Sequence, residues 1–166
     1  ANELPQHLSL PVLVQGTTSK RLLLEQFVET KHAVLLGTGS FWEGVDVRGD
    51  TLSCVIIDKL PFAPPDDPVY QAKSELIKNR GGNAFQDLSL PDAAIALKQG
   101  AGRLIRTESD QGVLVLCDNR LVTTGYGRRL IAALPPMHQL QTAEALAQSL
   151  DALNQDFISR ASTTTF

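Results

Sequence analysis

Short apolar runs recur along the first two thirds of the chain, separated by polar or amphipathic stretches. These runs are continuous rather than alternating, and they predict strands over 11–15, 33–36, 52–58 and 112–116. Continuous apolar strands are typical of a sheet that is covered on both of its faces. We therefore expect buried strands with helices on both sides.

Segments with helical spacing occupy the intervals between the strands and the end of the chain. They predict helices over 20–30, 69–79, 93–107, 126–133 and 142–157. Thr17, Thr18 and Ser19 supply N-cap candidates for the first helix. Strands that alternate with helices of about ten residues imply an α/β fold with a mostly parallel sheet.

The carboxyl ends of the predicted strands lead into the glycine-rich, polar and aromatic segments QGTTSK, GTGSFWEG, DKLPFAPP and CDNRLVTTGYG. Ligands of parallel sheets bind beyond these ends, so we expect the ligand site of this domain there. Gln15 and Thr17 contact a DNA backbone in one interpretation and cap a helix in the other. Arg120, Arg128 and Arg129 line a phosphate track in one interpretation, and Arg120 forms a structural pair with Asp118 in the other.

Size and composition narrow the class of protein. The 166 residues suffice for one full core, and the net charge of −3 excludes a strongly basic module that binds nucleic acid by charge alone. No apolar run approaches the length of about 18 residues needed for a membrane span, and the first ten residues do not resemble a signal peptide. We expect a cytoplasmic protein that does not bind a membrane.

The cysteines and histidines do not predict a metal site. Cys54 and Cys117 lie in apolar runs, which indicates buried free thiols in a reducing compartment. Two cysteines cannot supply the four thiolates of an iron–sulfur cluster. His7, His32 and His138 lie far apart in the sequence.

The segment QGAGRLIR, residues 99–106, carries the most specific chemistry. On a helix over 93–107, Gln99, Arg103 and Arg106 share one stripe. Ala94, Leu97, Ala101 and Leu104 form the opposite, core-facing side. Gly100 and Gly102 each cost about 1 kcal/mol inside a helix relative to alanine, which indicates a backbone that lies close to a ligand or a partner domain.

The chain contains no G-x-x-x-x-G-K-[ST] loop that could cradle phosphates. We therefore expect it not to bind and hydrolyse ATP alone. Gly37-Thr38-Gly39 is not a dinucleotide fingerprint, because Trp42 stands where the third glycine belongs. Arginines can instead reach phosphates that another domain holds, and their forked guanidinium suits phosphate oxygens. This interpretation requires accessible arginines near the edge where the strands end.

The segment GTGSFWEGVDVRGD, residues 37–50, has two interpretations. In the first, it is a structural turn with two core aromatics and a solvated pair of acids. In the second, it grips single-stranded nucleic acid: Ser40 offers a hydroxyl, Phe41 and Trp42 offer stacking faces, and Glu43 and Asp46 orient neighbouring arginines.

These segments resemble a known family. GTGSFWEGVDVRG, followed about sixty residues later by QGAGRLIR, is similar to the two late helicase motifs of the DinG/XPD group in superfamily two. DNRLVTTGYGRRLIAALPP resembles the segment that closes the second motor domain in bacterial members. The resemblance covers nearly all of the chain.

The resemblance implies that residues 1–166 form the second RecA-like motor domain of an ATP-dependent 5′–3′ DNA helicase of DNA repair or replication. Gln99, Gly102, Arg103 and Arg106 match motif VI, whose arginines reach the γ-phosphate. Residues 40–46 match motif V, which couples the nucleotide to the DNA strand, and Gly44 and Asp46 fall within it.

The resemblance also implies cofactors and partners. ATP with Mg²⁺ would be shared with the first motor domain of the same chain, and family members hold a 4Fe–4S cluster in that domain. The motifs of that domain are absent here, so the chain resembles a C-terminal fragment that lacks an opening strand and helix and is inactive alone. Single-stranded DNA is the implied substrate, and the clamp-loader chi (χ) subunit is a suggested partner.

The alternative function is a non-catalytic docking module for a replication or repair protein. Four apolar residues recur at helical spacing in the last predicted helix and form one stripe: Leu146, Leu150, Leu153 and Phe157. This stripe either covers the motor core or docks a partner.

Overall fold

The computed structural model describes residues 7–30, 32–41, 47, 51–105 and 110–163. The chain forms two compact units, residues 1–52 and residues 53–166. Within the described ranges, every helix is too short or too polar to cross a membrane.

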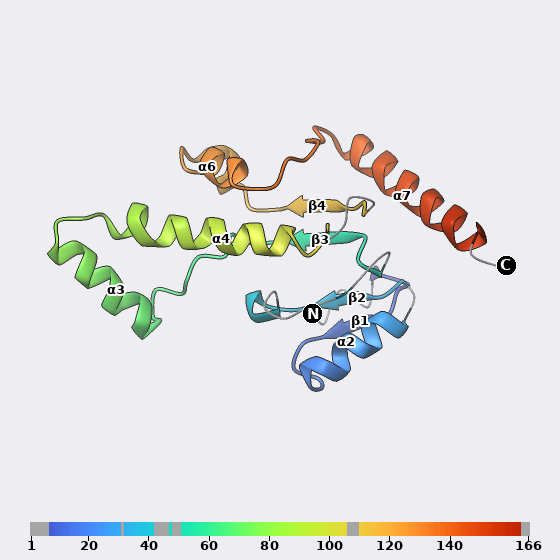
Figure 1. The fold of residues 1–166 in the computed structure, drawn as a ribbon, viewed down its shortest axis with the longest axis horizontal. Coiled ribbons are helices and arrows are strands. Elements are labelled where there is room, and N and C mark those ends of the chain that lie inside the picture. The colour runs from blue at the N-terminus through green and yellow to red at the C-terminus, as the bar shows by residue number, and fades with distance from the viewer. Residues whose placement is uncertain (1–6, 31, 42–46, 48–50, 106–109, 164–166) are drawn as a thin grey trace. The chain divides into compact units, whose positions relative to one another are not determined.

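The first unit is a small βαβ arrangement (Figure 1). Strand β1 (Val12–Val14) pairs in parallel with β2 (Val34–Leu36), with Val12 opposite Val34, and helix α2 (Lys20–Glu29) connects them. Ser19 caps this helix by accepting a hydrogen bond from the backbone N–H of Leu22. A short 3-10 helix, η1 (Gly39–Phe41), follows β2. The core of the unit is made by Leu23, Phe27, Phe41 and Val47.

The second unit contains a second parallel pair. Strand β3 (Cys54–Ile57) lies beside β4 (Val113–Leu116), with Cys54 opposite Val113 and Ile57 opposite Leu116. Between them the chain forms α3 (Pro68–Asn79), the π-helical segment η3 (Phe85–Ser89) and α4 (Leu90–Ala101). After β4 come α5 (Arg120–Thr123), α6 (Gly127–Ala132) and α7 (Ala143–Thr163).

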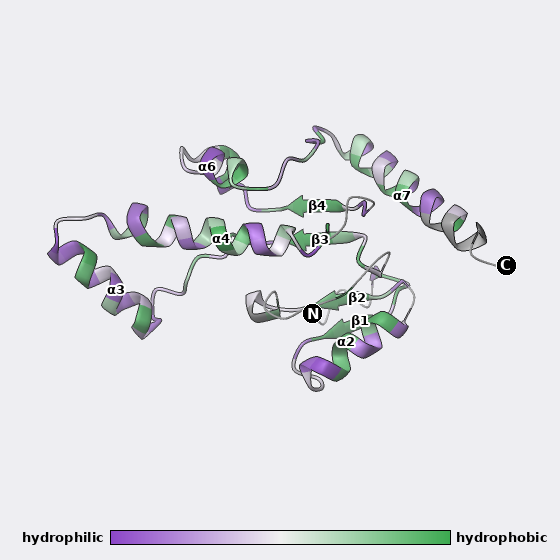
Figure 2. Ribbon diagram, in the orientation of Figure 1, coloured by the Kyte–Doolittle hydropathy of each residue, from purple (hydrophilic) through white to green (hydrophobic). Residues whose placement is uncertain are grey.

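The α/β class with parallel strands and helical connections is confirmed, and the mixed architecture agrees with the RecA-like domain that the resemblance implies. Figure 2 shows the strands as hydrophobic throughout, whereas α3 and α7 alternate between polar and apolar positions. Full coverage of both sheet faces is not observed: most strand residues are half-buried, and Ile56 is 67% exposed. Within the part of the chain that the structure describes, each sheet has two strands, so each strand is paired on one side only.

The helix predicted over 93–107 has different bounds. It begins at Leu90 and ends at Ala101, and Gly102 caps its carboxyl end. The backbone N–H groups of Arg103 and Leu104 bond to the carbonyls of Gly100 and Ala101, at 3.2 and 3.1 Å, which tightens the chain into a turn. Gln99 and Arg103 therefore do not share a helical stripe. The apolar side is confirmed, since Leu97, Ala101 and Leu104 are buried and Ala94 is half-buried.

Candidate nucleotide and nucleic-acid site

Arg103 lies in the turn that follows α4, where its side chain is half-buried, while Gln99 and Gly102 are exposed. Its neighbour Leu104 packs against Gly112: a Cβ at Gly112 would lie 2.4 Å from Leu104 Cδ1 and 3.0 Å from the Ser53 carbonyl oxygen. Ser53 and Gly112 immediately precede β3 and β4. The turn with Arg103 therefore lies beside the amino-terminal ends of these strands.

This position corrects the expectation that the arginines lie at the edge where the strands end. Helix α4 runs in the opposite direction to β3 and β4 (Figure 1), so its carboxyl end meets the beginnings of the strands. Arg106, the second predicted arginine, lies outside the described residues.

Gln15 joins the carboxyl ends of β1 and β2. Its side-chain oxygen accepts hydrogen bonds from the backbone N–H of Thr38 at 2.7 Å and from the Thr38 hydroxyl at 3.1 Å. The Thr17 hydroxyl donates to the Val14 carbonyl at 2.8 Å. These contacts order the loops at this edge, and the helix cap is Ser19 rather than Thr17.

Phe41 does not present a stacking face, which corrects the second interpretation of residues 37–50 for this side chain. Its ring is 5% exposed and packs in the core of the first unit. Lys20 Nζ lies 5.2 Å from the ring centroid and covers it further. Ser40 contributes its backbone to η1, whereas Trp42, Glu43, Gly44 and Asp46 lie outside the described residues.

Arg120 forms the structural pair with Asp118. Its Nε lies 2.9 Å from Asp118 Oδ1 and its Nη2 lies 2.6 Å from Oδ2. Asp118 Oδ2 also accepts the backbone N–H of Leu60 at 2.9 Å, so the pair ties the loop after β4 to the loop after β3. The hydrogen bond from Arg120 is the largest cause that lowers the pKa of the Asp118 carboxyl, whose side chain is 8% exposed.

Replacing Asp118 by asparagine is expected to cost about 1.5–3 kcal/mol of the free energy of unfolding at pH 7, because charge-assisted hydrogen bonds to Arg120 are lost. The folded state lowers the pKa of this carboxyl. The wild-type advantage is therefore complete above the unfolded pKa of about 4 and declines as the pH falls below it. Urea denaturation at several pH values measures this. Asp58→Asn, at an exposed carboxylate after β3, is the control, and an equal loss in both variants would contradict the prediction.

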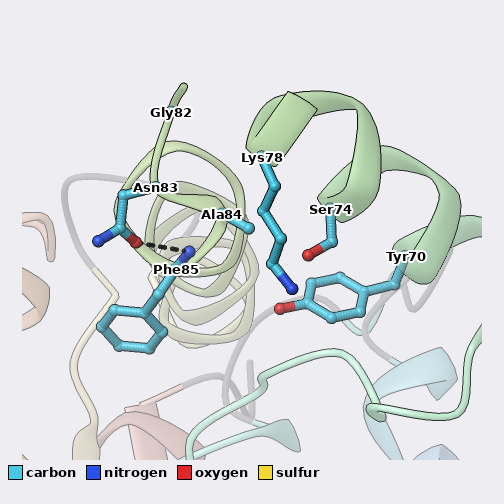
Figure 3. A pocket seen from close by; sticks show the side chains of 7 residues that line it. All are labelled: Tyr70, Ser74, Lys78, Gly82, Asn83, Ala84 and Phe85. Carbon is cyan, nitrogen blue, oxygen red and sulfur yellow. Dashed lines mark hydrogen bonds between the residues drawn. The ribbon is translucent and has the colours of Figure 1, made fainter. Parts of the chain in front are cut away.

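A cavity of about 460 Å³ lies between α3 and the start of η3 (Figure 3). The lining residues are Tyr70, Ser74, Lys78, Gly82, Asn83, Ala84 and Phe85. The Tyr70 hydroxyl is hydrogen-bonded to the Ser89 hydroxyl at 2.5 Å, and the Lys78 side chain extends toward Tyr70 in Figure 3. None of the residues predicted to bind nucleotide or DNA lines this cavity.

The aromatic cluster formed by Phe62, Phe85 and Tyr126 was missed by the sequence analysis. Its ring centroids are separated by 5.1–6.1 Å. Phe62 and Tyr126 belong to the polar and aromatic segments that follow β3 and β4. Because the carboxyl ends of neighbouring parallel strands lie at the same edge, the positions of these segments in the sequence could have predicted that the two rings meet. Phe85 comes from η3, and the sequence places it nowhere near the other two.

The two cysteines do not fit a 4Fe–4S cluster. Cys54 begins β3 and Cys117 follows the end of β4, so they lie at opposite ends of the strand pair. Cys54 is half-buried and burial raises the pKa of its thiol, whereas Cys117 is exposed, so the prediction of a buried thiol at Cys117 is wrong. Among the described residues, no three His, Cys, Asp or Glu side chains are grouped so that they could hold a metal ion.

Comparison with known proteins relates the chain to helicases. It is 62% identical over 129 residues to the ATP-dependent DNA helicase YoaA of Escherichia coli (strain K12), covering 78% of this chain and 20% of that protein. It is 52% identical to YoaA of Haemophilus influenzae (strain ATCC 51907 / DSM 11121 / KW20 / Rd), covering 85% of this chain and 22% of that protein. The chain is 43% identical to the ATP-dependent helicase DinG of Mycobacterium tuberculosis (strain ATCC 25618 / H37Rv), and the match covers 87% of this chain and 22% of that protein.

The chain thus spans about a fifth of the length of these relatives. Residues 1–137 match the family model described as the helicase C-terminal domain. This match covers more than half of the chain and includes both late motifs. The chain therefore belongs to the helicase C-terminal domain family of the DinG/XPD group.

Proposed function

We propose that this chain is the second motor domain of an ATP-dependent 5′–3′ DNA helicase that acts in DNA repair or replication. The observation that carries the proposal is the family match over residues 1–137, which includes the segments 37–50 and 99–106 in the family's order. Relatives that are 43–62% identical are named ATP-dependent helicases. These relatives come from bacteria, in which chromosomal DNA lies in the cytoplasm. A helicase that acts on this DNA would be cytoplasmic, as the sequence analysis expects.

In this proposal, Arg103 and Arg106 contact the γ-phosphate of ATP that a P-loop domain holds, and Mg²⁺ neutralises part of the phosphate charge when it is bound. Charge-assisted bonds from a guanidinium to phosphate oxygens are strong and directional. The Arg103 turn lies beside the amino-terminal ends of β3 and β4 and not at the edge where the strands end, so the geometry that the sequence interpretation required is not met. The family match alone supports the contact with the γ-phosphate, which requires the phosphates to approach the second unit from the amino-terminal ends of these strands. Gln99 and Gly102 are exposed next to this turn and complete the contact.

The coupling to DNA is assigned to the loops around β1 and β2. Ser40, Trp42 and Glu43 remain the proposed DNA contacts of segment 37–50, and Gly44 and Asp46 the nucleotide contacts. Loss of the γ-phosphate removes the bonds to the arginines and the cleft between the motor domains opens. Repeated opening and closing of this cleft moves the single-stranded DNA along these loops.

The proposal predicts that the full-length protein hydrolyses ATP in a DNA-stimulated reaction and separates a duplex with a 5′ single-stranded tail, whereas residues 1–166 alone do neither. The isolated chain lacks a phosphate-cradling loop, so it should bind ATP only weakly. A coupled ATPase assay and a strand-displacement assay measure both properties. Hydrolysis by the full-length protein that ignores DNA would overturn the helicase assignment, and tight ATP binding by the isolated chain would overturn the shared nucleotide site.

The docking alternative depends on the apolar stripe of α7. Leu153 in this stripe is 8% exposed and Leu146 is half-buried, which favours a helix that covers the core. Leu150 is partly exposed, and the side chain of Phe157 lies outside the described residues. Nothing in this pattern selects the clamp-loader χ subunit, so the motor function is the one we carry forward.

A further inference from the structure

The aromatic cluster beside the carboxyl ends of β3 and β4 carries an inference of its own. Phe85 contacts both of its partners, with its centroid 5.8 Å from Phe62 and 5.1 Å from Tyr126. Phe62 and Tyr126 meet edge to face at 6.1 Å and an interplanar angle of 89°. Such offset and edge-to-face contacts stabilise ring clusters, so the three side chains hold one another in place.

The cluster is anchored to the ends of both strands. Arg120 lies over the Phe62 ring, with its Cζ 5.3 Å from the ring centroid. The same guanidinium is fixed by Asp118, which also accepts the backbone N–H of Leu60, two residues before Phe62. The rings are therefore preorganised by contacts that exist before any ligand arrives.

The cluster remains partly open to solvent. Phe85 is 37% exposed, and Phe62 and Tyr126 are half-buried. The core rings of the first unit, by contrast, are almost completely buried. An exposed aromatic face next to fixed neighbours is a surface on which a planar base can stack.

Positive charge borders this surface. Arg129 is exposed and its Nη1 donates to the side-chain oxygen of Gln86, the residue after Phe85 in η3, at 2.6 Å, which holds the guanidinium on this helix without neutralising it. Arg128 is exposed beside it. Single-stranded nucleic acids bind where aromatic faces take the bases and cations take the phosphates. An apolar peptide would use the rings alone, so the arginines favour a nucleic acid.

We propose that Phe62, Phe85 and Tyr126, bordered by Arg129, form a base-stacking surface for single-stranded DNA. This inference depends on the proposed helicase function and replaces Phe41 as the source of stacking. Phe85 supplies the exposed ring, Phe62 and Tyr126 support it, and Arg129 contacts the adjacent phosphate. Asp118 and Arg120 position the cluster.

The test measures binding of a fluorescein-labelled oligothymidylate to the full-length protein, in parallel with an abasic strand of the same length. Phe85→Leu keeps an apolar side chain against Phe62 and Tyr126 but removes the aromatic face. We expect it to weaken binding of oligothymidylate about tenfold and to leave binding of the abasic strand unchanged. Phe85→Trp should restore affinity. Ile95→Ala removes an exposed apolar side chain from α4 and should change neither value.

Arg129→Gln provides a second measurement that does not disturb the rings. It should weaken binding of the oligothymidylate and of the abasic strand alike. The slope of log affinity against log salt concentration should fall by about one, as expected for the loss of one phosphate contact. Equal affinity of Phe85→Leu and wild type for oligothymidylate would overturn the inference, as would an equal loss on both strands. Unchanged DNA binding together with loss of a protein partner would assign the surface to a peptide instead. A wild-type protein that binds no DNA would overturn the helicase function as well.

Discussion

Arg103→Ala, in a protein that carries this chain together with its P-loop domain, is expected to reduce DNA-stimulated ATP hydrolysis by about 1,000-fold or more. An arginine that one domain supplies to phosphates held by another contributes roughly 10³–10⁵ to the rate of phosphoryl transfer. Binding of single-stranded DNA should change little, because the Arg103 turn lies beside the amino-terminal ends of β3 and β4, whereas the proposed stacking surface lies beyond their carboxyl ends. Turnover with saturating DNA and fluorescence anisotropy measure the two quantities.

Two further variants separate chemistry from folding. Lys98→Ala removes an exposed cation from α4, the helix that precedes the Arg103 turn, and should leave turnover unchanged. Arg103→Lys keeps the charge but loses the bidentate fork, so turnover should stay far below that of wild type. Because Arg103 is half-buried, its variants should be compared with wild type by thermal denaturation. Full turnover in Arg103→Ala at unchanged stability would remove this residue from the phosphate site.

The strands were predictable because their signal is local. The run GVLVL at 112–116 is apolar throughout, and the first charged residue after it is Asp118. The structure places β4 at Val113–Leu116. Ser19 is one of the three N-cap candidates that the sequence offered, and it caps α2, which begins at Lys20 as predicted. Residues that are close in the sequence determine such strands and caps, so these features can be predicted without knowing how the chain packs.

The end of the arginine helix was not predictable in the same way. Helical spacing continues through Leu104, and the sequence shows no proline that would stop the helix there. The turn at Gly102–Leu104 brings Leu104 against Gly112, a contact between residues that the linear pattern does not connect. Gly102, which caps the helix, and the packing of Leu104 against Gly112 together fix where the helix ends and where Arg103 lies.

Aromatic residues in loops were equally ambiguous. Phe41 follows β2 and Phe62 follows β3, and both lie in the segment after the strand. Phe41 nevertheless packs in a core, whereas Phe62 joins a half-exposed cluster. Loop residues have no period that distinguishes an inward from an outward side chain. Only the partners, α2 for Phe41 and η3 for Phe62, settle which environment each ring enters.

Gly127→Ala is expected to lower the free energy of unfolding by about 3 kcal/mol, at the upper end of the range for overpacking. A Cβ at Gly127 would lie 2.1 Å from the Leu121 carbonyl oxygen and 2.6 Å from the Arg120 carbonyl oxygen. These are backbone atoms of α5, so no side-chain rotation can relieve the clash. The glycine is buried and begins α6, and the two helices must separate to admit a methyl group.

Gly125→Ala is the matched control, two residues away. A Cβ at Gly125 would have no heavy atom within 4 Å, so we expect a change within about 0.5 kcal/mol. Urea denaturation of both variants gives the comparison, and equal stabilities would contradict the close approach of α5 and α6. Separation of the helices would also move Arg120 relative to Tyr126. Gly127→Ala should therefore weaken binding of oligothymidylate under conditions in which it remains folded, which links the packing of this glycine to the stacking surface.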